Sequence, residues 1–147
     1  MKSKKVIISA CLIGYLCRYD GKTKESHGIL EAFEGYEIIP FCPEAPLFGT
    51  PRERISIIEI DGINRIVSDE TLRDVTQELI YEINTFIALH PDAETIVLKS
   101  KSPSCGLGTT PILNKQREHI GYGNGIAAEM FLAHYTFSKI SDESPYL

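Results

Sequence analysis

Three short apolar runs rich in β-branched residues constrain the fold of this chain more than any other feature. They are Lys5–Cys11, Tyr36–Cys42 and Thr95–Lys99, and each has the length of one buried strand. Between the last two runs, apolar residues recur at helical spacing over Asp74–His90, and Pro91 ends the pattern. Neighbouring parallel strands need such crossover helices. The sequence therefore predicts an α/β fold, a single three-layer domain with a mainly parallel sheet.

A β-hairpin insertion is expected in the middle of the chain. Arg54–Ile60 and Ile63–Ser68 both resemble strands, and they flank Asp61-Gly62, a pair typical of tight hairpin turns. Shorter helices are expected over His27–Glu34 and, at the end of the chain, from the glycines at 121–125 to about residue 134. These elements complete an alternating pattern of strands and helices.

Length, charge and cysteine content narrow the class of protein. A chain of 147 residues without a Ser/Gly/Pro-rich linker predicts one domain over residues 1–147, with no appended module. The net charge of −5 argues against a nucleic-acid partner. No apolar run approaches the roughly 20 residues that cross a bilayer, so no membrane partner is expected. We expect a cytoplasmic protein, in which four cysteines are more often ligands, nucleophiles or core residues than disulfides.

Three of the cysteines fall at corresponding places in the predicted fold. Cys11 and Cys42 each end a predicted strand, and Cys105 lies in the loop beyond the third strand. In an open parallel sheet the carboxyl ends lie along one edge, where ligands bind. The three thiols are therefore expected to converge. The alternative interpretation is three separate core residues, since free cysteine is among the most buried residue types.

The residues around two of these cysteines favour a functional site. Cys42 precedes Pro43-Glu44, which fixes the backbone and places a carboxylate beside the thiol. Cys105 follows a polar stretch of serines and a proline, which offers hydrogen-bond donors but little apolar surface. Lys99 and Lys101 add positive charge that favours thiolates. A residue that only fills the core does not need such surroundings.

Soft thiolates suit both zinc and iron–sulfur clusters. Zinc is usually completed by a cysteine or histidine at short spacing, which none of the four histidines provides. Three ligands without a local fourth suit a [4Fe–4S] cluster with one iron left open. Cys17 as a fourth ligand would close the cluster and favour electron transfer. Its position in a loop, six residues after Cys11, favours a structural or incidental thiol.

Seven short stretches, in order along the chain, resemble the domain-of-unknown-function family 523, whose characterised members are thiouracil desulfidases. The resemblance implies a Rossmann-like domain that holds a [4Fe–4S] cluster on Cys11, Cys42 and Cys105. The stretches are Ser9–Gly14, Arg18–Gly21, Pro40–Glu44, Thr50–Arg52, Asp74–Thr76, Lys99–Gly106 and Gly123–Ile126.

The resemblance also implies an activity. We expect an iron–sulfur-dependent desulfidase that removes sulfur as sulfide from a thiolated nucleobase or similar thiocarbonyl compound such as 2-thiouracil, by non-redox hydrolysis. Glu44 is the expected general base for water. Ser102 is the expected proton relay or orienting hydroxyl and Ser104 is the second choice, although either serine could instead bond its own turn. Residues 45–57 depart from the family pattern, so we expect a difference there to bear on the substrate.

Two other functions fit part of the sequence. A non-catalytic iron–sulfur or sulfide carrier would use the same three cysteines and would not need Glu44. The stretch Cys11–Arg18 is also similar to the phosphate loop of low-molecular-weight tyrosine phosphatases, but one residue too many separates the cysteine from the arginine. That reading also leaves Cys42 and Cys105 without a role. The sequence carries no signal for an oligomeric state.

Overall fold

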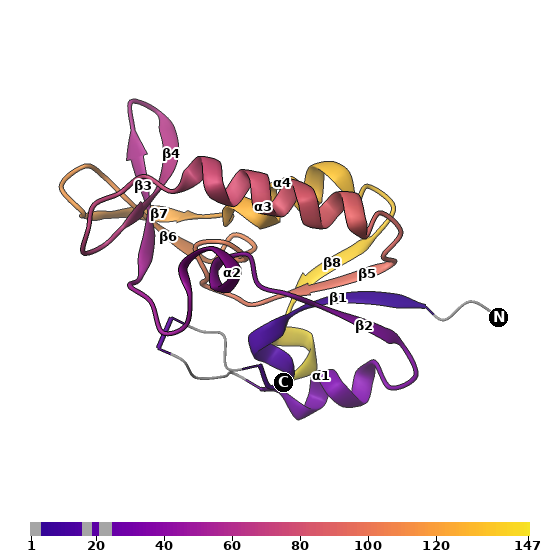
Figure 1. Cartoon of the computed structure of the whole chain (residues 1–147). Coiled ribbons are helices and arrows are strands. Elements are labelled where there is room, and N and C mark those ends of the chain that lie inside the picture. The colour runs from indigo at the N-terminus through magenta and orange to yellow at the C-terminus, as the bar shows by residue number, and fades with distance from the viewer. Residues whose placement is uncertain (1–3, 16–18, 21–24) are drawn as a thin grey trace.

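The computed structural model describes residues 4–15, 19–20 and 25–147, and their strands form two four-stranded sheets. Sheet A is parallel throughout, which confirms the predicted α/β fold with a mainly parallel sheet (Figure 1). In spatial order its strands are β2 (Glu37–Phe41), β1 (Lys5–Ser9), β5 (Thr95–Leu98) and β8 (Lys139–Asp142).

Sheet B contains the predicted hairpin but is larger than a hairpin. The turn Asp61-Gly62 has φ angles of 52° and 81°, the left-handed values that such a pair adopts readily in a two-residue turn. β3 also pairs in parallel with β6, and β6 pairs antiparallel with β7. The strands are β4 (Ile63–Ser68), β3 (Ile55–Ile60), β6 (Thr110–Leu113) and β7 (His119–Gly123).

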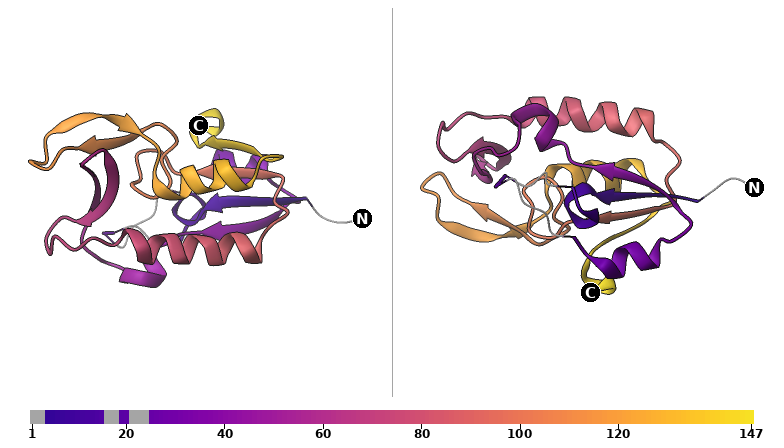
Figure 2. Two further views of the ribbon diagram at one scale, coloured as in Figure 1. Left: turned by 90° about the horizontal axis from the view of Figure 1, so that it is seen from above. Right: turned by 60° about the horizontal axis from the view of Figure 1, so that its bottom comes forward.

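Helices cover both faces of sheet A (Figures 1 and 2). Two long helices lie side by side on one face, and a short helix lies on the other face together with two 3-10 turns. The first set is α3 (Thr76–Leu89) and α4 (Ile126–His134); the second is α1 (His27–Ala32), η1 (Ala10–Ile13) and η2 (Ser144–Tyr146); α2 (Glu44–Phe48) follows β2.

The best sequence-predicted helix carries the main core. Leu79 and Ile83 on α3 are fully buried and share one hydrophobic cluster with Ile96 of β5 and Phe131 of α4. The helix begins at Thr76, two residues after the first residue of the expected range, Asp74, whose carboxylate accepts the Thr76 N–H at 3.0 Å. None of the helices in the described part of the chain is long and apolar enough to cross a membrane.

The structure corrects two expected boundaries near the strand ends. β1 ends at Ser9 rather than Cys11, because the chain turns into η1 there. Ser9 pairs with Phe41, the last residue of β2, so the two strands end level. The last helix begins at Ile126 rather than among the glycines at 121–125, since residues 119–123 form β7. Because the two strands end level, Cys11 and Cys42, which follow them, lie at the same edge of sheet A.

Candidate active site

A cavity of about 420 Å³ opens where β1, β2 and β5 end. Cys11, Cys42 and Cys105 all line it. Cys11 lies in η1, Cys42 directly follows β2, and Cys105 lies in the loop between β5 and β6. Topology thus brings three cysteine side chains that are distant in sequence to one cavity. Cys17 lies outside the described residues.

The thiol of Cys105 is strongly perturbed by its surroundings. Its burial raises its pKa, and negative charge on Cys42 and Glu44 would raise the pKa further. Hydrogen bonds from the Ser9 and Ser102 hydroxyls to its side chain act in the opposite direction but do not compensate. The Cys105 thiol is therefore protonated at neutral pH in this structure. Binding of a metal or cluster requires the thiolate and would release that proton.

The loop that carries Cys105 is fixed by the first turn of α4. Backbone N–H groups of Gly125, Ile126 and Ala127 donate to the carbonyls of Gly106, Pro103 and Ser104, at 2.7, 3.3 and 2.7 Å. The free amides at a helix start thus bind the carbonyls of the cysteine loop. The family-like stretch around Gly125 has a physical reason, because a Cβ there would lie 2.5 Å from the Ser104 carbonyl carbon.

Inside the loop, Ser102 closes a local turn. Its Oγ accepts the backbone N–H groups of both Ser104 and Cys105, at 3.1 Å each. The Ser102 carbonyl accepts the Thr110 hydroxyl at 2.6 Å and the Gly106 N–H at 2.9 Å. Ser102 therefore bonds its own turn, as one sequence interpretation expected, and at the same time lines the cavity beside Cys105.

Glu44 begins the short helix α2 and lines the same cavity. Its Oε2 accepts the Ser104 hydroxyl at 2.8 Å, and its Oε1 lies 3.5 Å from Nη2 of Arg52. Both side chains of the ion pair are buried, with exposed fractions of 12% for Glu44 and 6% for Arg52. Ser104, not the preferred Ser102, is the serine that contacts the carboxylate.

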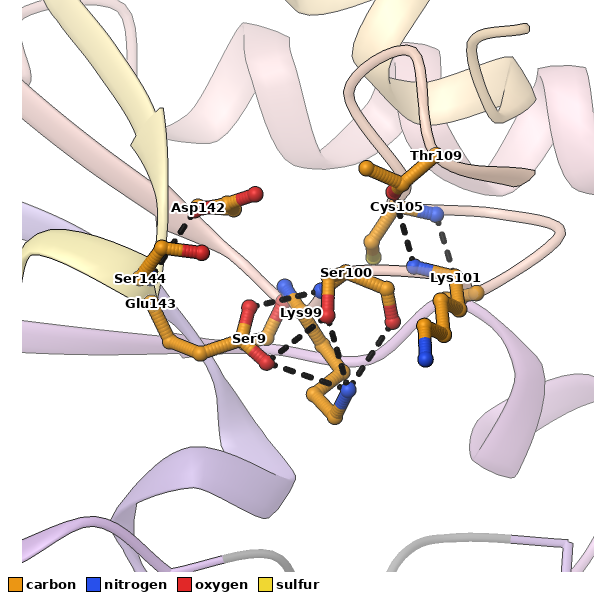
Figure 3. Close-up of polar contacts among 10 residues, drawn as sticks. Ser9, Lys99, Ser100, Lys101, Cys105, Thr109, Asp142, Glu143 and Ser144 are labelled. Carbon is orange, nitrogen blue, oxygen red and sulfur yellow. Dashed lines mark hydrogen bonds and ion pairs between the residues drawn. The ribbon is translucent and has the colours of Figure 1, made fainter. Parts of the chain in front are cut away.

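A second carboxylate supports the cavity from the end of the chain (Figure 3). Glu143 accepts the Ser100 N–H at 2.8 Å, the Ser100 hydroxyl at 2.9 Å and the Lys99 ammonium at 3.0 Å. Burial opposes the ionisation of Glu143, but these hydrogen bonds outweigh it and hold its pKa below the usual value. The Lys99 N–H donates to Ser9 Oγ at 2.9 Å, and this hydroxyl in turn contacts Cys105.

Five predicted site residues line this cavity, namely Cys11, Cys42, Glu44, Ser102 and Cys105, whereas the second-choice Ser104 reaches the site through Glu44. Sequence reasoning missed the roles of three others: Arg52, Ser9 and Glu143. Arg52 and Ser9 lie in the family-like stretches but were given no task. Glu143 directly follows Asp142 near residue 147, and no local pattern marks it as part of the site.

The three cysteines at the cavity can be compared with the ligands that a single metal ion and an iron–sulfur cluster require. In the described ranges, no three His, Cys, Asp or Glu side chains lie close enough to hold one metal ion. A four-iron cluster is larger than an ion and holds its ligands farther apart. The soft sulfur donors of the three cysteines around one cavity suit an iron–sulfur group.

Comparisons with known proteins agree with this geometry. The sequence profile of the 2-thiouracil desulfurase family matches residues 6–143. The uncharacterized protein YbbK of Bacillus subtilis (strain 168) is 32% identical over an alignment of 112 residues, and the match covers 70% of this chain and 74% of YbbK. A solved structure of the [4Fe-4S]-dependent thiouracil desulfidase TudS is 30% identical, with a TM-score of 0.74, covering 97% of this chain and 92% of that chain.

The family match spans both sheets and every residue that lines the cavity. The TudS structure shares the whole fold, so the agreement is not limited to a short motif. The chain belongs to the 2-thiouracil desulfurase family.

Proposed function

We propose that this protein is a [4Fe–4S]-dependent desulfidase that hydrolyses a thiolated nucleobase or similar thiocarbonyl compound, such as 2-thiouracil, and releases sulfide. The observation that carries the proposal is the meeting of Cys11, Cys42 and Cys105 with the carboxylate of Glu44 around one cavity. Membership of the desulfurase family and the likeness to TudS support it. Cysteine ligands for a cluster suit the reducing cytoplasm.

Cys11, Cys42 and Cys105 would hold the cluster, one from each of three strand ends. When bound, the cluster supplies a Lewis acid at the iron that no cysteine occupies, which polarises the thiocarbonyl group. The reaction is a substitution of oxygen for sulfur: a C–O bond to water forms, the C–S bond breaks, and its electron pair leaves with sulfur. Nothing is oxidised or reduced, and the two protons of water end on the products.

Glu44 would take the proton of the attacking water. Its carboxylate lies in the cavity, two residues from Cys42, and each of its oxygens keeps a lone pair beyond the bonds to Ser104 and Arg52. A positioned carboxylate of this kind contributes about 10²–10⁴-fold to proton transfer.

Ser102 would orient the substrate or return a proton to the leaving sulfur. Its Oγ is fixed by the amides of Ser104 and Cys105, and its single hydroxyl proton, which is directed at the Cys105 side chain in this structure, would turn from there to the substrate. That hydroxyl contacts the Cys105 side chain and lines the cavity, so it lies where a cluster and substrate would meet.

The test is anaerobic reconstitution followed by counts of iron and sulfide per chain and by assay with 2-thiouracil, measuring both sulfide and uracil. We expect a loaded cluster and release of both products in a 1:1 ratio. Cys11→Ala, Cys42→Ala and Cys105→Ala should each lower the iron content. Product without a cluster, or a fully loaded cluster in all three variants, would contradict the proposal.

Glu44→Gln separates catalysis from a carrier function. We expect this variant to keep its iron and to lose about 10²–10⁴-fold in turnover. Glu59→Gln, at an exposed position on β3, is the matched control and should behave like the unmodified protein. A loaded protein that gives no uracil, and in which Glu44→Gln changes nothing, would instead support the iron–sulfur or sulfide carrier.

A further inference from the structure

The carboxylate of Glu44 is held from two sides by side chains that are themselves fixed. One oxygen accepts the Ser104 hydroxyl at 2.8 Å and the other faces Nη2 of Arg52 at 3.5 Å. A buried carboxylate needs such partners, because its charge has lost most of its water. The question is whether these two residues merely neutralise Glu44 or determine where it points.

Arg52 has little freedom to follow a moving carboxylate. Its Nη1 donates to the Gly49 carbonyl at 3.1 Å and to the Thr50 hydroxyl at 3.3 Å. Its backbone N–H donates to the Tyr19 carbonyl at 2.7 Å. The planar guanidinium is therefore clamped on one edge and presents the other edge to Glu44, a geometry that a lysine cannot reproduce.

Ser104 is equally fixed, and by the cysteine loop itself. It is fully buried, its N–H donates to Ser102 Oγ at 3.1 Å, and its carbonyl accepts the Ala127 N–H at 2.7 Å. Cys105 is the next residue along the chain. The hydroxyl that contacts Glu44 is thus set by the same backbone that sets the Cys105 sulfur.

We propose that Arg52 and Ser104 are positioning residues that fix the carboxylate of Glu44 relative to the three cysteines, so that it faces the site where water attacks. This inference rests on the proposed function, because it concerns the group that we assign as general base. Neither residue needs to touch the substrate. Their effect passes through Glu44 alone.

The experiment measures kcat and KM for sulfide release from 2-thiouracil by reconstituted protein, with iron content and the cluster absorption spectrum measured alongside. Arg52→Gln and Ser104→Ala should each lower kcat about 10- to 100-fold, the effect of a displaced catalytic group. KM should stay within about twofold, because uniform binding of the substrate is unchanged. Iron content and the spectrum should also stay unchanged.

The decisive comparison is with Glu44→Gln. If Arg52 acts through Glu44, then Arg52→Gln added to Glu44→Gln should cause no further fall in kcat, a non-additive result. In cluster-free protein, Arg52→Gln and Glu44→Gln together should lower the urea midpoint by less than the sum of their separate effects. A full multiplicative loss of kcat, a shift in KM alone, or independent urea midpoints would overturn the inference.

The chain offers a matched control. Asp69 is also held by a serine and an arginine, since its Oδ1 accepts Ser56 Oγ at 2.7 Å and Arg117 Nη1 at 2.9 Å, and none of these three residues lines the cavity. Ser56→Ala and Arg117→Gln remove the same kinds of bond and should leave kcat unchanged. If the unmodified loaded protein releases no sulfide, the proposed function is wrong. If it does release sulfide, and Arg52→Gln and Ser104→Ala are as active as the unmodified protein, only the positioning role is wrong.

Discussion

Gly125 supports the loop that carries Cys105, and replacing it by alanine tests how tightly that support is built. An added Cβ would lie 2.5 Å from the Ser104 carbonyl carbon, 2.6 Å from its oxygen and 2.7 Å from the Cys105 nitrogen. The backbone of Gly125 has φ −64° and ψ 161°, which any residue adopts. The cost of Gly125→Ala therefore comes from the overlap and not from the conformation of the residue itself.

The size of the effect follows from the distance that the loop must move. Ordinary contact begins near 3.4 Å, so a contact of 2.5 Å must open by roughly 0.9 Å. That movement stretches the hydrogen bonds from α4 to the carbonyls of Pro103, Ser104 and Gly106, and each such bond contributes about 1 kcal/mol. We expect a loss of about 2–3 kcal/mol, which lowers Tm by about 4–12 °C for a chain of this size.

The assay measures both thermal stability and iron content, because the loop contributes hydrogen bonds to the fold and carries the thiol of Cys105. Tm is measured by circular dichroism on cluster-free protein, and iron per chain is measured after anaerobic reconstitution. Gly125→Ala should lower both, since Cys105 moves with Ser104. Gly121→Ala is the control, because no atom lies within 4 Å of the added Cβ there. An unchanged Tm together with full iron content in Gly125→Ala would refute the reasoning.

Three further changes test other parts of the structure. Glu143→Gln should lower the free energy of unfolding by about 1–3 kcal/mol at pH 7, because it weakens the bonds to Lys99 and Ser100. Folding lowers the pKa of Glu143, so this difference should be present above about pH 4.5 and vanish as the pH falls through the folded-state pKa. Urea unfolding at a series of pH values measures it. Leu79→Ala should cost about 2–5 kcal/mol in thermal unfolding, since the side chain is fully buried, and an unchanged Tm would contradict the core described above. Gly62→Ala should cost about 1–2 kcal/mol through its left-handed φ of 81° while reconstituted iron stays at the unmodified level, and a loss of iron would show that the hairpin influences the site.

Much of sheet A could be predicted because its signals are local and its topology is restrictive. β-branched runs gave β1, β2 and β5 to within one or two residues, and helical periodicity gave α3. Parallel strands place their carboxyl ends at one edge, so the convergence of the cysteines on one cavity followed from where each lay in its segment. Pro40 did not exclude β2, because β2 is an edge strand of sheet A.

Sheet B was only half predicted because two of its strands have weak local signals. β6 contains Pro111 and β7 contains two glycines, residues that are depleted in strands. What stabilises β6 is pairing with β3, where Ile57 lies opposite Ile112, and β7 in turn pairs with β6. No window of sequence reveals such a contact. The expected start of the last helix at residues 121–125 was wrong for the same reason, because those residues complete β7.

Ser102 and Ser104 differ in how far their contacts could be predicted from the local sequence. A serine that precedes a turn predicts a bond to its own backbone, and Ser102 makes that bond. The contact between Ser104 and Glu44 joins residues sixty positions apart and depends on the relative placement of α2 and the cysteine loop. Sequence reasoning could name both serines as candidates, but the choice between their roles needed coordinates.

Residues 45–57 depart from the family pattern, and the structure indicates how that departure can reach the reaction. The carboxylate of Glu44 is bound on one side by Ser104, whose position is set by the cysteine loop and α4. On the other side it faces Arg52, which is held by Gly49, the last residue of the departing stretch 45–49, and by its neighbour Thr50. A change within 45–57 therefore moves the arginine without moving the serine. It alters the direction of the carboxylate while the three thiols keep their places, so we expect this segment to vary turnover between substrates before it affects cluster binding.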